Sequence, residues 1–368
     1  MVERFARRTV LDFDPYEWEA SSETVAARHG LAVGDVVRFD LNTSPHPPAS
    51  WDRAMDAARA ERIPNEYFDT AYAELASLIA PYCDVGEDQL TIGAGADEIL
   101  DVITKTFLDN GDAVVIPVPT YSMYAICARQ LGATVRTVPR DADFAIDEAA
   151  TLAAAAGAKI LFICNPNSPT GNPADPAAIE RLIAAAPCMV VVDEAYAEFQ
   201  EWSAIPLIAK YPNLIVVRTM SKGFGMAGMR LGWGVAQADV AALMNRVRPP
   251  NSVSEVTARV AAAALRDLDG MRAHVAAIVA EREPFAEALR AFGAHVYPSV
   301  TNFVLTRWPD VATAQRVYTG LERRGMVVRN FSGSPIIPAH LRLTVRTAEE
   351  NTRLIEALGE IVPPLATY

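Results

Sequence analysis

The segment LIVVRTMSKGFGMAGMRLG (residues 214–232) joins a short apolar run to a loop rich in glycine. Near-continuous apolar runs of this length are typical of strands buried on both faces of a parallel sheet. The loop carries Lys222 soon after the run ends. Because α/β folds bind ligands at the carboxyl ends of such strands, the segment predicts an α/β fold with a lysine at its ligand-binding edge.

Similar apolar runs recur along the first two thirds of the chain and alternate with amphipathic segments. This alternation favours a large α/β domain with a mostly parallel seven-stranded sheet sandwiched by helices. Asp147 and Gly157 are suited to cap an Ala-rich helix between them. The predicted strands are at 90–92, 113–116, 134–138, 159–163, 189–192, 214–217 and 233–235, with helices at 97–108, 121–130, 149–156 and 175–185.

The pattern changes after Arg248-Pro249-Pro250. A helical region extends over about 254–292 with a break near 267–270, where a glycine follows two acidic residues. The rest predicts a smaller α+β domain, with strands at 302–305, 326–328 and 341–345 and helices at 311–324 and 348–358. We expect an N-terminal arm (1–40) that packs on the small domain, a large domain (41–250) and a small domain (251–368).

Composition excludes several classes of function. The net charge of −12 argues against a nucleic-acid partner, which would need a basic patch. No uncharged apolar stretch is long enough to predict a membrane span, and the N-terminus does not resemble a signal peptide, so a cytoplasmic location is expected. The five histidines lack metal-ligand spacing, and no metal is expected. The four cysteines, which form no CxxC pair, are expected to be reduced and buried: Cys83, Cys127, Cys164 and Cys188.

Two strand ends carry the clearest chemistry. Lysines are usually solvated, but Lys222 at a ligand-binding edge could form an imine with an aldehyde, and Arg230 could lower its pKa and clamp a phosphate. Asp193 ends the run VVVD, where a buried carboxylate needs a cation such as a protonated pyridine nitrogen. Alternatively, Asp193 caps a following helix. Tyr196 could bond a phenolic oxygen on the same ring.

Three more strand ends carry weaker signals. GAGADE (93–98) could bind a phosphate at a helix N-terminus or be only a tight connection. In PTYSMY (119–124), Tyr121 could stack on an aromatic ring or pack in the core. NPNSPTG (165–171) could be only a proline-rich turn. Together, however, these segments suit different parts of one anionic aromatic aldehyde.

In this order, GAGADE, PTYSMY, NPNSPTG, VVVDEAY and SKGFGMAGMRLG resemble the fold-type I pyridoxal-phosphate aminotransferases, and most of all their histidinol-phosphate aminotransferase group. The likeness extends from Tyr16 to the C-terminal helix. It implies that Lys222 binds pyridoxal 5'-phosphate as a Schiff base and then moves protons. It also implies that Asp193 pairs with the pyridine nitrogen, that Tyr196 bonds the phenolic oxygen and that Tyr121 stacks on the ring.

The resemblance also implies how the cofactor phosphate is held. The backbone of Ala96 and Asp97 and the side chains of Ser221 and Arg230 match the family's phosphate site. Tyr67 matches a tyrosine that the family donates to the phosphate site of the partner subunit. A homodimer with shared active sites is therefore implied.

Substrate contacts follow from the same resemblance. Arg342 matches the arginine that grips a substrate carboxylate, and Arg329 and Tyr16 match residues that join it in holding the phosphate of histidinol phosphate. An arginine at a strand end could otherwise form only a surface ion pair. The implied reaction is transamination of histidinol phosphate or a related substrate, with 2-oxoglutarate as amino acceptor. Alternatives are an aromatic or other amino-acid aminotransferase, a decarboxylase resembling threonine-phosphate decarboxylase, or a non-catalytic regulator.

The chain departs from the family pattern in three places. Ser168 stands where an asparagine usually bonds the phenolic oxygen, so either this serine or Asn167 makes the bond. The entrance segment reads LNTSPH (41–46). Arg346 replaces a usual glycine, and an added cation there could mean a different acidic or phosphorylated substrate.

Overall fold

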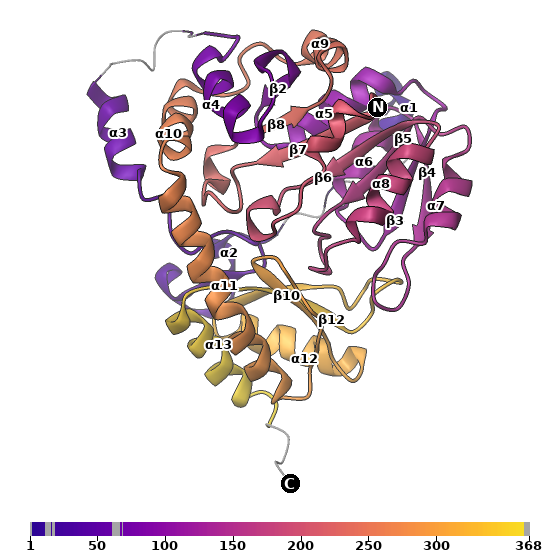
Figure 1. Cartoon of the computed structure of the whole chain (residues 1–368). Coiled ribbons are helices and arrows are strands. Elements are labelled where there is room, and N and C mark those ends of the chain that lie inside the picture. Colours follow the sequence, from indigo (N-terminus) through magenta and orange to yellow (C-terminus); the bar gives the residue numbers. More distant parts are fainter. Residues whose placement is uncertain (1, 12–15, 17–18, 61–66, 68, 364–368) are drawn as a thin grey trace.

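A computed structural model describes residues 2–11, 16, 19–60, 67 and 69–363. The remaining residues, which include parts of the predicted N-terminal arm and most of the segment around Tyr67, lie outside the described part. The chain forms a larger α/β unit and a smaller α+β unit, which lie at the top and bottom of Figure 1.

The larger unit contains the seven-stranded sheet that the sequence predicts. Its spatial order is β2-β8-β7-β6-β5-β3-β4. All neighbouring strands are parallel except β8, which is antiparallel to both β7 and β2. The mostly parallel α/β sheet is therefore confirmed. Its strands are β2 (Leu90–Gly93), β3 (Ala113–Val118), β4 (Thr134–Pro139), β5 (Ile160–Cys164), β6 (Met189–Asp193), β7 (Leu214–Thr219) and β8 (Gly232–Val235).

Both faces of this sheet are covered by helices, and the apolar runs explain why. In β6, Val190 and Val192 pack into one hydrophobic cluster, and Val191 packs into the cluster on the opposite face. A strand buried on both sides favours apolar residues at both phases of its two-residue period. One face is covered by α4 (Ala73–Cys83), α7 (Glu148–Ala155), α8 (Pro176–Ala185) and α10 (Glu255–Leu265), and the other by α5 (Ala96–Phe107), α6 (Met123–Gln130) and α9 (Ala238–Val247).

The smaller unit has a five-stranded sheet in the order β1-β11-β12-β10-β9. The sequence predicts three of its strands but misses β1 and β9, which are too short to show a period of two. β1 brings the N-terminal region into this sheet, parallel to β11. The strands are β1 (Val37–Phe39), β9 (His295–Val296), β10 (Phe303–Arg307), β11 (Met326–Asn330) and β12 (His340–Thr344), and the helices are α11 (Leu268–Arg290), α12 (Val311–Glu322) and α13 (Ala348–Gly359).

The consecutive helices α10 and α11 connect the two units (Figure 1). The predicted break between them is present, but Gly270 lies inside the first turn of α11 and does not form the break. The side chain of Asp267 caps α11 by accepting a hydrogen bond from the Gly270 amide at 3.2 Å. Asp147 caps α7 in the same way, through the amide of Ala150.

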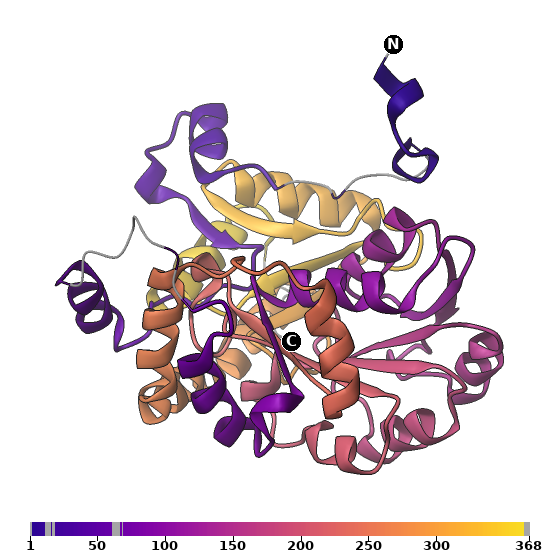
Figure 2. The same cartoon turned by 90° about the horizontal axis from the view of Figure 1, so that it is seen from above.

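The N-terminal region consists of short helices. α1 (Arg8–Leu11) lies beside α6, α2 (Ser22–His29) precedes β1, and α3 (Trp51–Ala60) packs against α10. Figure 2 shows the first residues of the chain standing apart from the main body. Within the described residues, no helix is long and apolar enough to cross a membrane. The division of the chain at residues 40 and 250 stays a prediction.

Candidate active site

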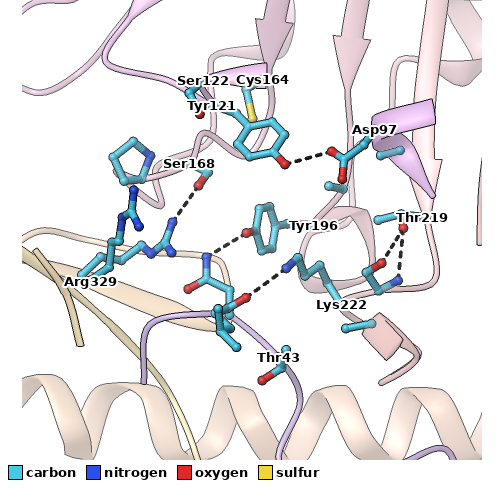
Figure 3. Close-up of a pocket in the computed structure, with 18 of the residues that line it drawn as sticks. Thr43, Asp97, Tyr121, Ser122, Cys164, Ser168, Tyr196, Thr219, Lys222 and Arg329 are labelled. Atoms are coloured by element: carbon cyan, nitrogen blue, oxygen red, sulfur yellow. Dashed lines mark hydrogen bonds between the residues drawn. The ribbon is translucent and has the colours of Figure 1, made fainter. Parts of the chain in front are cut away.

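A cavity of about 400 Å³ lies at the carboxyl ends of the central strands, where the larger unit faces β11 and β12 (Figure 3). Its wall includes twelve of the fourteen candidate residues. The exceptions are Asn167 and Tyr67. Residues from both terminal parts of the chain meet here with residues at or after the ends of β2, β3, β5, β6 and β7: Tyr16, Ala96, Asp97, Tyr121, Ser168, Asp193, Tyr196, Ser221, Lys222, Arg230, Arg329 and Arg342.

Lys222 projects into the cavity from the loop after β7 (Figure 3). Its Nζ donates a hydrogen bond to the Leu41 carbonyl at 3.3 Å. Burial and then the charge of Arg342 lower the pKa of Lys222 to about 8. Arg230, the cationic neighbour expected from the sequence, contributes less to this shift than Arg342 does. About a tenth of the amine is therefore unprotonated at pH 7, far more than for an ordinary lysine, and the unprotonated form is the one that acts as a nucleophile or general base.

Asp193 is buried at the end of β6. One carboxylate oxygen accepts the hydroxyl of Tyr124 at 2.7 Å, and the other accepts the amide of Ala195 at 3.0 Å. Burial raises the pKa of Asp193 to about 6. Asp193 forms no ion pair within the described residues, so the carboxylate suits a cation that enters the cavity. Tyr124 was not predicted from the sequence as a partner of Asp193, although it stands three residues after Tyr121 in PTYSMY and lies in the first turn of α6.

Tyr196 is positioned by a residue that the sequence did not single out. Asn42 donates from Nδ2 to the Tyr196 hydroxyl at 2.8 Å (Figure 3). The Tyr196 ring meets Phe303 edge to face, with ring centroids 5.2 Å apart. Asn42 itself is buried and accepts a hydrogen bond from Asn302 through its carbonyl at 2.9 Å. The only sequence signal was its place in the entrance segment LNTSPH.

One end of the cavity is built to bind an anion. The first amides of a helix have no partner within the helix, and at the start of α5 these belong to Ala96 and Asp97. Arg230 reaches Asp97 at 3.2 Å and the Ser221 hydroxyl at 3.4 Å. Two glycines permit this approach, because a Cβ on Gly95 would lie 2.6 Å from the Arg230 guanidinium and one on Gly232 would lie 2.6 Å from the Ala96 nitrogen. Amides, hydroxyl and guanidinium together suit a phosphate.

The Tyr121 ring lies near this end of the cavity (Figure 3). Its hydroxyl donates to Asp97 at 2.9 Å, and its ring contacts Tyr124 edge to face at 5.7 Å between centroids. The Tyr121 ring is thus held in place by a hydrogen bond at its hydroxyl and by packing against Tyr124. Such a fixed ring can form one wall for an aromatic ligand.

The opposite end of the cavity carries two arginines. Arg329 of β11 and Arg342 of β12 are direct cross-strand neighbours. Arg342 donates to the Ser168 hydroxyl at 3.2 Å and to the Asp40 carbonyl at 2.6 Å. Arg329 forms an ion pair with Glu19. Guanidinium groups are well suited to form bidentate hydrogen bonds with a carboxylate or a phosphate.

Ser168 and Asn167 differ in their access to the cavity. Ser168 lines the cavity, whereas Asn167 is buried and does not line it. Ser168 is favoured as the residue that meets a ligand, because the Asn167 amide is engaged elsewhere. Its oxygen accepts from Thr120 and Arg140, and its nitrogen donates to Pro119 and Thr170, at 2.8, 3.3, 3.0 and 2.6 Å respectively.

Arg346 does not add a cation to the cavity, contrary to the expectation from the sequence. It lies outside the cavity wall and forms two hydrogen bonds with Glu350, at 3.1 and 2.9 Å. The spacing of four residues brings these two side chains together at the start of α13. Tyr67 is 88 % exposed in the single chain, and its contact with a partner subunit stays a prediction.

Known proteins resemble this chain over nearly its whole length. Residues 30–358 match the model of the family "aminotransferase class I and II". The histidinol-phosphate aminotransferase of Roseiflexus castenholzii is 36% identical, over 96% of this chain and 97% of that protein, and the one of Caldanaerobacter subterraneus is 33% identical, over 98% and 100%. The crystal structure of histidinol-phosphate aminotransferase from Sinorhizobium meliloti in complex with pyridoxal-5'-phosphate superposes with a TM-score of 0.88 at 25% identity, covering 96% of each chain.

Proposed function

The chain belongs to the class I and II aminotransferases, and from this premise we propose that it transaminates histidinol phosphate or a related amine with pyridoxal phosphate as cofactor. The observation that carries the proposal is one cavity with two cationic ends, which are the start of α5 with Arg230 and the pair Arg329 and Arg342. One end suits the phosphate of the cofactor and the other an anionic group of the substrate. Lys222 lies between them.

The residues of the cavity fit this cofactor. Asp193 is a buried carboxylate in need of a cation, which a protonated pyridine nitrogen would provide. Tyr196 and Ser168 would face its phenolic oxygen, and Tyr121 its ring. Pyridoxal phosphate, when bound, supplies an aldehyde that captures amines and a ring that accepts an electron pair. Its phosphate would be held by the amides of Ala96 and Asp97 and the side chains of Ser221 and Arg230.

The chain's own groups divide the remaining work. Lys222, with a pKa of about 8, can accept a proton at Nζ and return it without a large energetic cost. Asn42 holds the Tyr196 hydroxyl in place at 2.8 Å. Arg342 orients an anionic substrate group, so that the reacting atoms lie near the lysine. A guanidinium donates hydrogen bonds to phosphates and to carboxylates alike. The end of the cavity with Arg329 and Arg342 can therefore also bind 2-oxoglutarate, the proposed amino acceptor.

A panel of half-reactions tests the substrate. The cofactor-loaded protein is mixed in turn with histidinol phosphate, aromatic amino acids, acidic amino acids and threonine phosphate, and the change in cofactor absorbance is followed. We expect histidinol phosphate to give the highest kcat/KM, by about 10²-fold or more, because two neighbouring guanidinium groups would bind its phosphate. Arg342→Lys should narrow this advantage.

A different result from the panel contradicts the proposal. Equal rates for all amines, or a preference for an aromatic amino acid, would refute the substrate. Release of carbon dioxide from threonine phosphate without an oxo acid would refute the transaminase assignment in favour of a lyase.

We also propose that the protein acts as a homodimer in which Tyr67 completes the partner's phosphate site. Exposed apolar side chains on the projecting N-terminal segment support an interface: Val2, Phe5, Val10 and Leu11. Sedimentation should show a dimer for the parent and for Tyr67→Phe. The substitution should weaken cofactor binding about tenfold, as expected for the loss of one hydrogen bond to a charged group. A monomer with full cofactor affinity would contradict this. The cytoplasmic location also stays a prediction.

A further inference from the structure

Arg329 and Arg342 place two positive charges side by side. They are directly opposite each other on the antiparallel strands β11 and β12, and both line the cavity. Like charges in this position destabilise a sheet. Burial, together with the charge of Arg329, lowers the pKa of Arg342. In the absence of a substrate, this pair therefore needs a negative charge nearby.

Among the described residues, two carboxylates line this end of the cavity, and they differ in whether they are free to pair with the two arginines. Asp40 is engaged by Arg38, with N–O distances of 2.9 and 2.6 Å, and offers Arg342 only its carbonyl. Glu19, by contrast, forms an ion pair with Arg329 and lines the cavity itself. Its side chain is about one-quarter exposed, so the contact is only partly removed from water.

Glu19 belongs to the segment that leads into α2. The side chain of Ser21 caps this helix by accepting the Thr24 amide. α2 is attached to the smaller unit by an ion pair between Arg28 and Glu322, at 2.9 Å. The carboxylate of Glu19 is thus delivered to the cavity by a separate segment that is anchored beyond it, and it can leave Arg329 without disturbing β11 or β12.

We propose that Glu19 is an internal counter-ion that occupies Arg329 until the anionic group of the substrate displaces it. The inference rests on the proposed function, because the displacing anion is taken to be the phosphate of the substrate. A group with two negative charges can satisfy Arg329 and Arg342 together, which Glu19 cannot do. Glu19 therefore raises the dissociation constant of every anion that binds Arg329, including free phosphate.

Titration with inorganic phosphate tests this role. The protein is loaded with cofactor first, so that the α5 phosphate site is filled, and binding is measured by calorimetry. Glu19→Gln, which keeps the shape of the side chain, should bind phosphate about tenfold more tightly than the parent, as expected when a competing charge is removed. In an Arg329→Gln background the same change should bring no gain, because the counter-ion then has nothing to neutralise.

A matched control separates this effect from net charge. Glu360→Gln breaks the surface ion pair with Arg324, whose atoms are 2.9 Å apart, and neither residue lines the cavity. It should leave phosphate binding unchanged. The counter-ion role is wrong if folded Glu19→Gln binds phosphate no more tightly than the parent. It is also wrong if Glu19→Gln still raises the phosphate affinity in the Arg329→Gln background. If the phosphate result is as expected but histidinol phosphate is not transaminated, the counter-ion stands and the substrate assignment alone fails.

Discussion

Lys222→Ala is expected to lower kcat by about 10⁴-fold or more, because the change removes both the nucleophile and the proton carrier of the cavity. Among the described residues, the Lys222 side chain makes one hydrogen bond, to the Leu41 carbonyl. Its loss should therefore leave the thermal unfolding temperature of the cofactor-free protein nearly unchanged. A variant that turns over at the parent's rate would refute the assignment of this lysine.

Covalent attachment provides a second readout for Lys222. After borohydride reduction of the cofactor-loaded parent, mass spectrometry should find the added mass on the peptide that contains Lys222, and the alanine variant should show none. Lys210→Ala is a suitable control, since Lys210 is an exposed lysine that pairs with Glu180 at 2.8 Å. It should keep both the adduct and the activity. An adduct on another lysine would contradict the proposed role.

Asp193→Asn should lower kcat by about 10²–10³-fold, the scale expected when one partner of a buried charge pair is lost. The asparagine retains an oxygen for the Ala195 amide but has no charge with which to keep a ring nitrogen protonated. Steady-state kinetics with saturating cofactor measures the loss. Tyr124→Phe, which removes the hydroxyl that donates to Asp193 at 2.7 Å but keeps the charge, should have a smaller effect. Activity within tenfold of the parent in Asp193→Asn would contradict the assignment.

Although Asp193→Asn should lower kcat, it should raise the free energy of unfolding of the cofactor-free protein. Burial raises the pKa of Asp193 from 3.8 to about 6. A carboxyl group with a raised pKa stabilises the fold fully below pH 3.8, and this contribution is lost as the pH rises to about 6. At pH 8 the uncharged Asp193→Asn variant should therefore be more stable than the parent, by up to about 3 kcal/mol. Urea unfolding should show this difference shrinking as the pH falls from 6 towards 4, which separates lost chemistry from misfolding.

The chemistry at the centre of the cavity could be predicted because it follows from strand patterns. β6 and β7 each begin with an apolar run of four residues, 189–192 and 214–217. Asp193 ends the first of these strands, and Lys222 lies in the loop after the second. These strands are parallel neighbours. Parallel strands end at one edge of a sheet, so the two groups had to lie close together. The spacing of four residues between Arg346 and Glu350 likewise predicts their ion pair, which occupies this arginine outside the cavity wall.

The rim of the cavity depends on contacts that no local pattern encodes. Asn42 meets Tyr196 across 154 positions of the chain. The choice of Ser168 over Asn167 depends on the backbone path of a single loop, and the pairing of Glu19 with Arg329 depends on how the N-terminal segment lies against the smaller unit.

The sheet, the helices around it and the lysine and carboxylate at its edge can thus be predicted from the order of the amino acids, because burial on two faces leaves continuous apolar runs along the chain. The groups that complete the cavity depend on tertiary contacts. Hydrogen bonds and ion pairs form or fail over distances of about an ångström, and the packing of the two units against each other sets those distances.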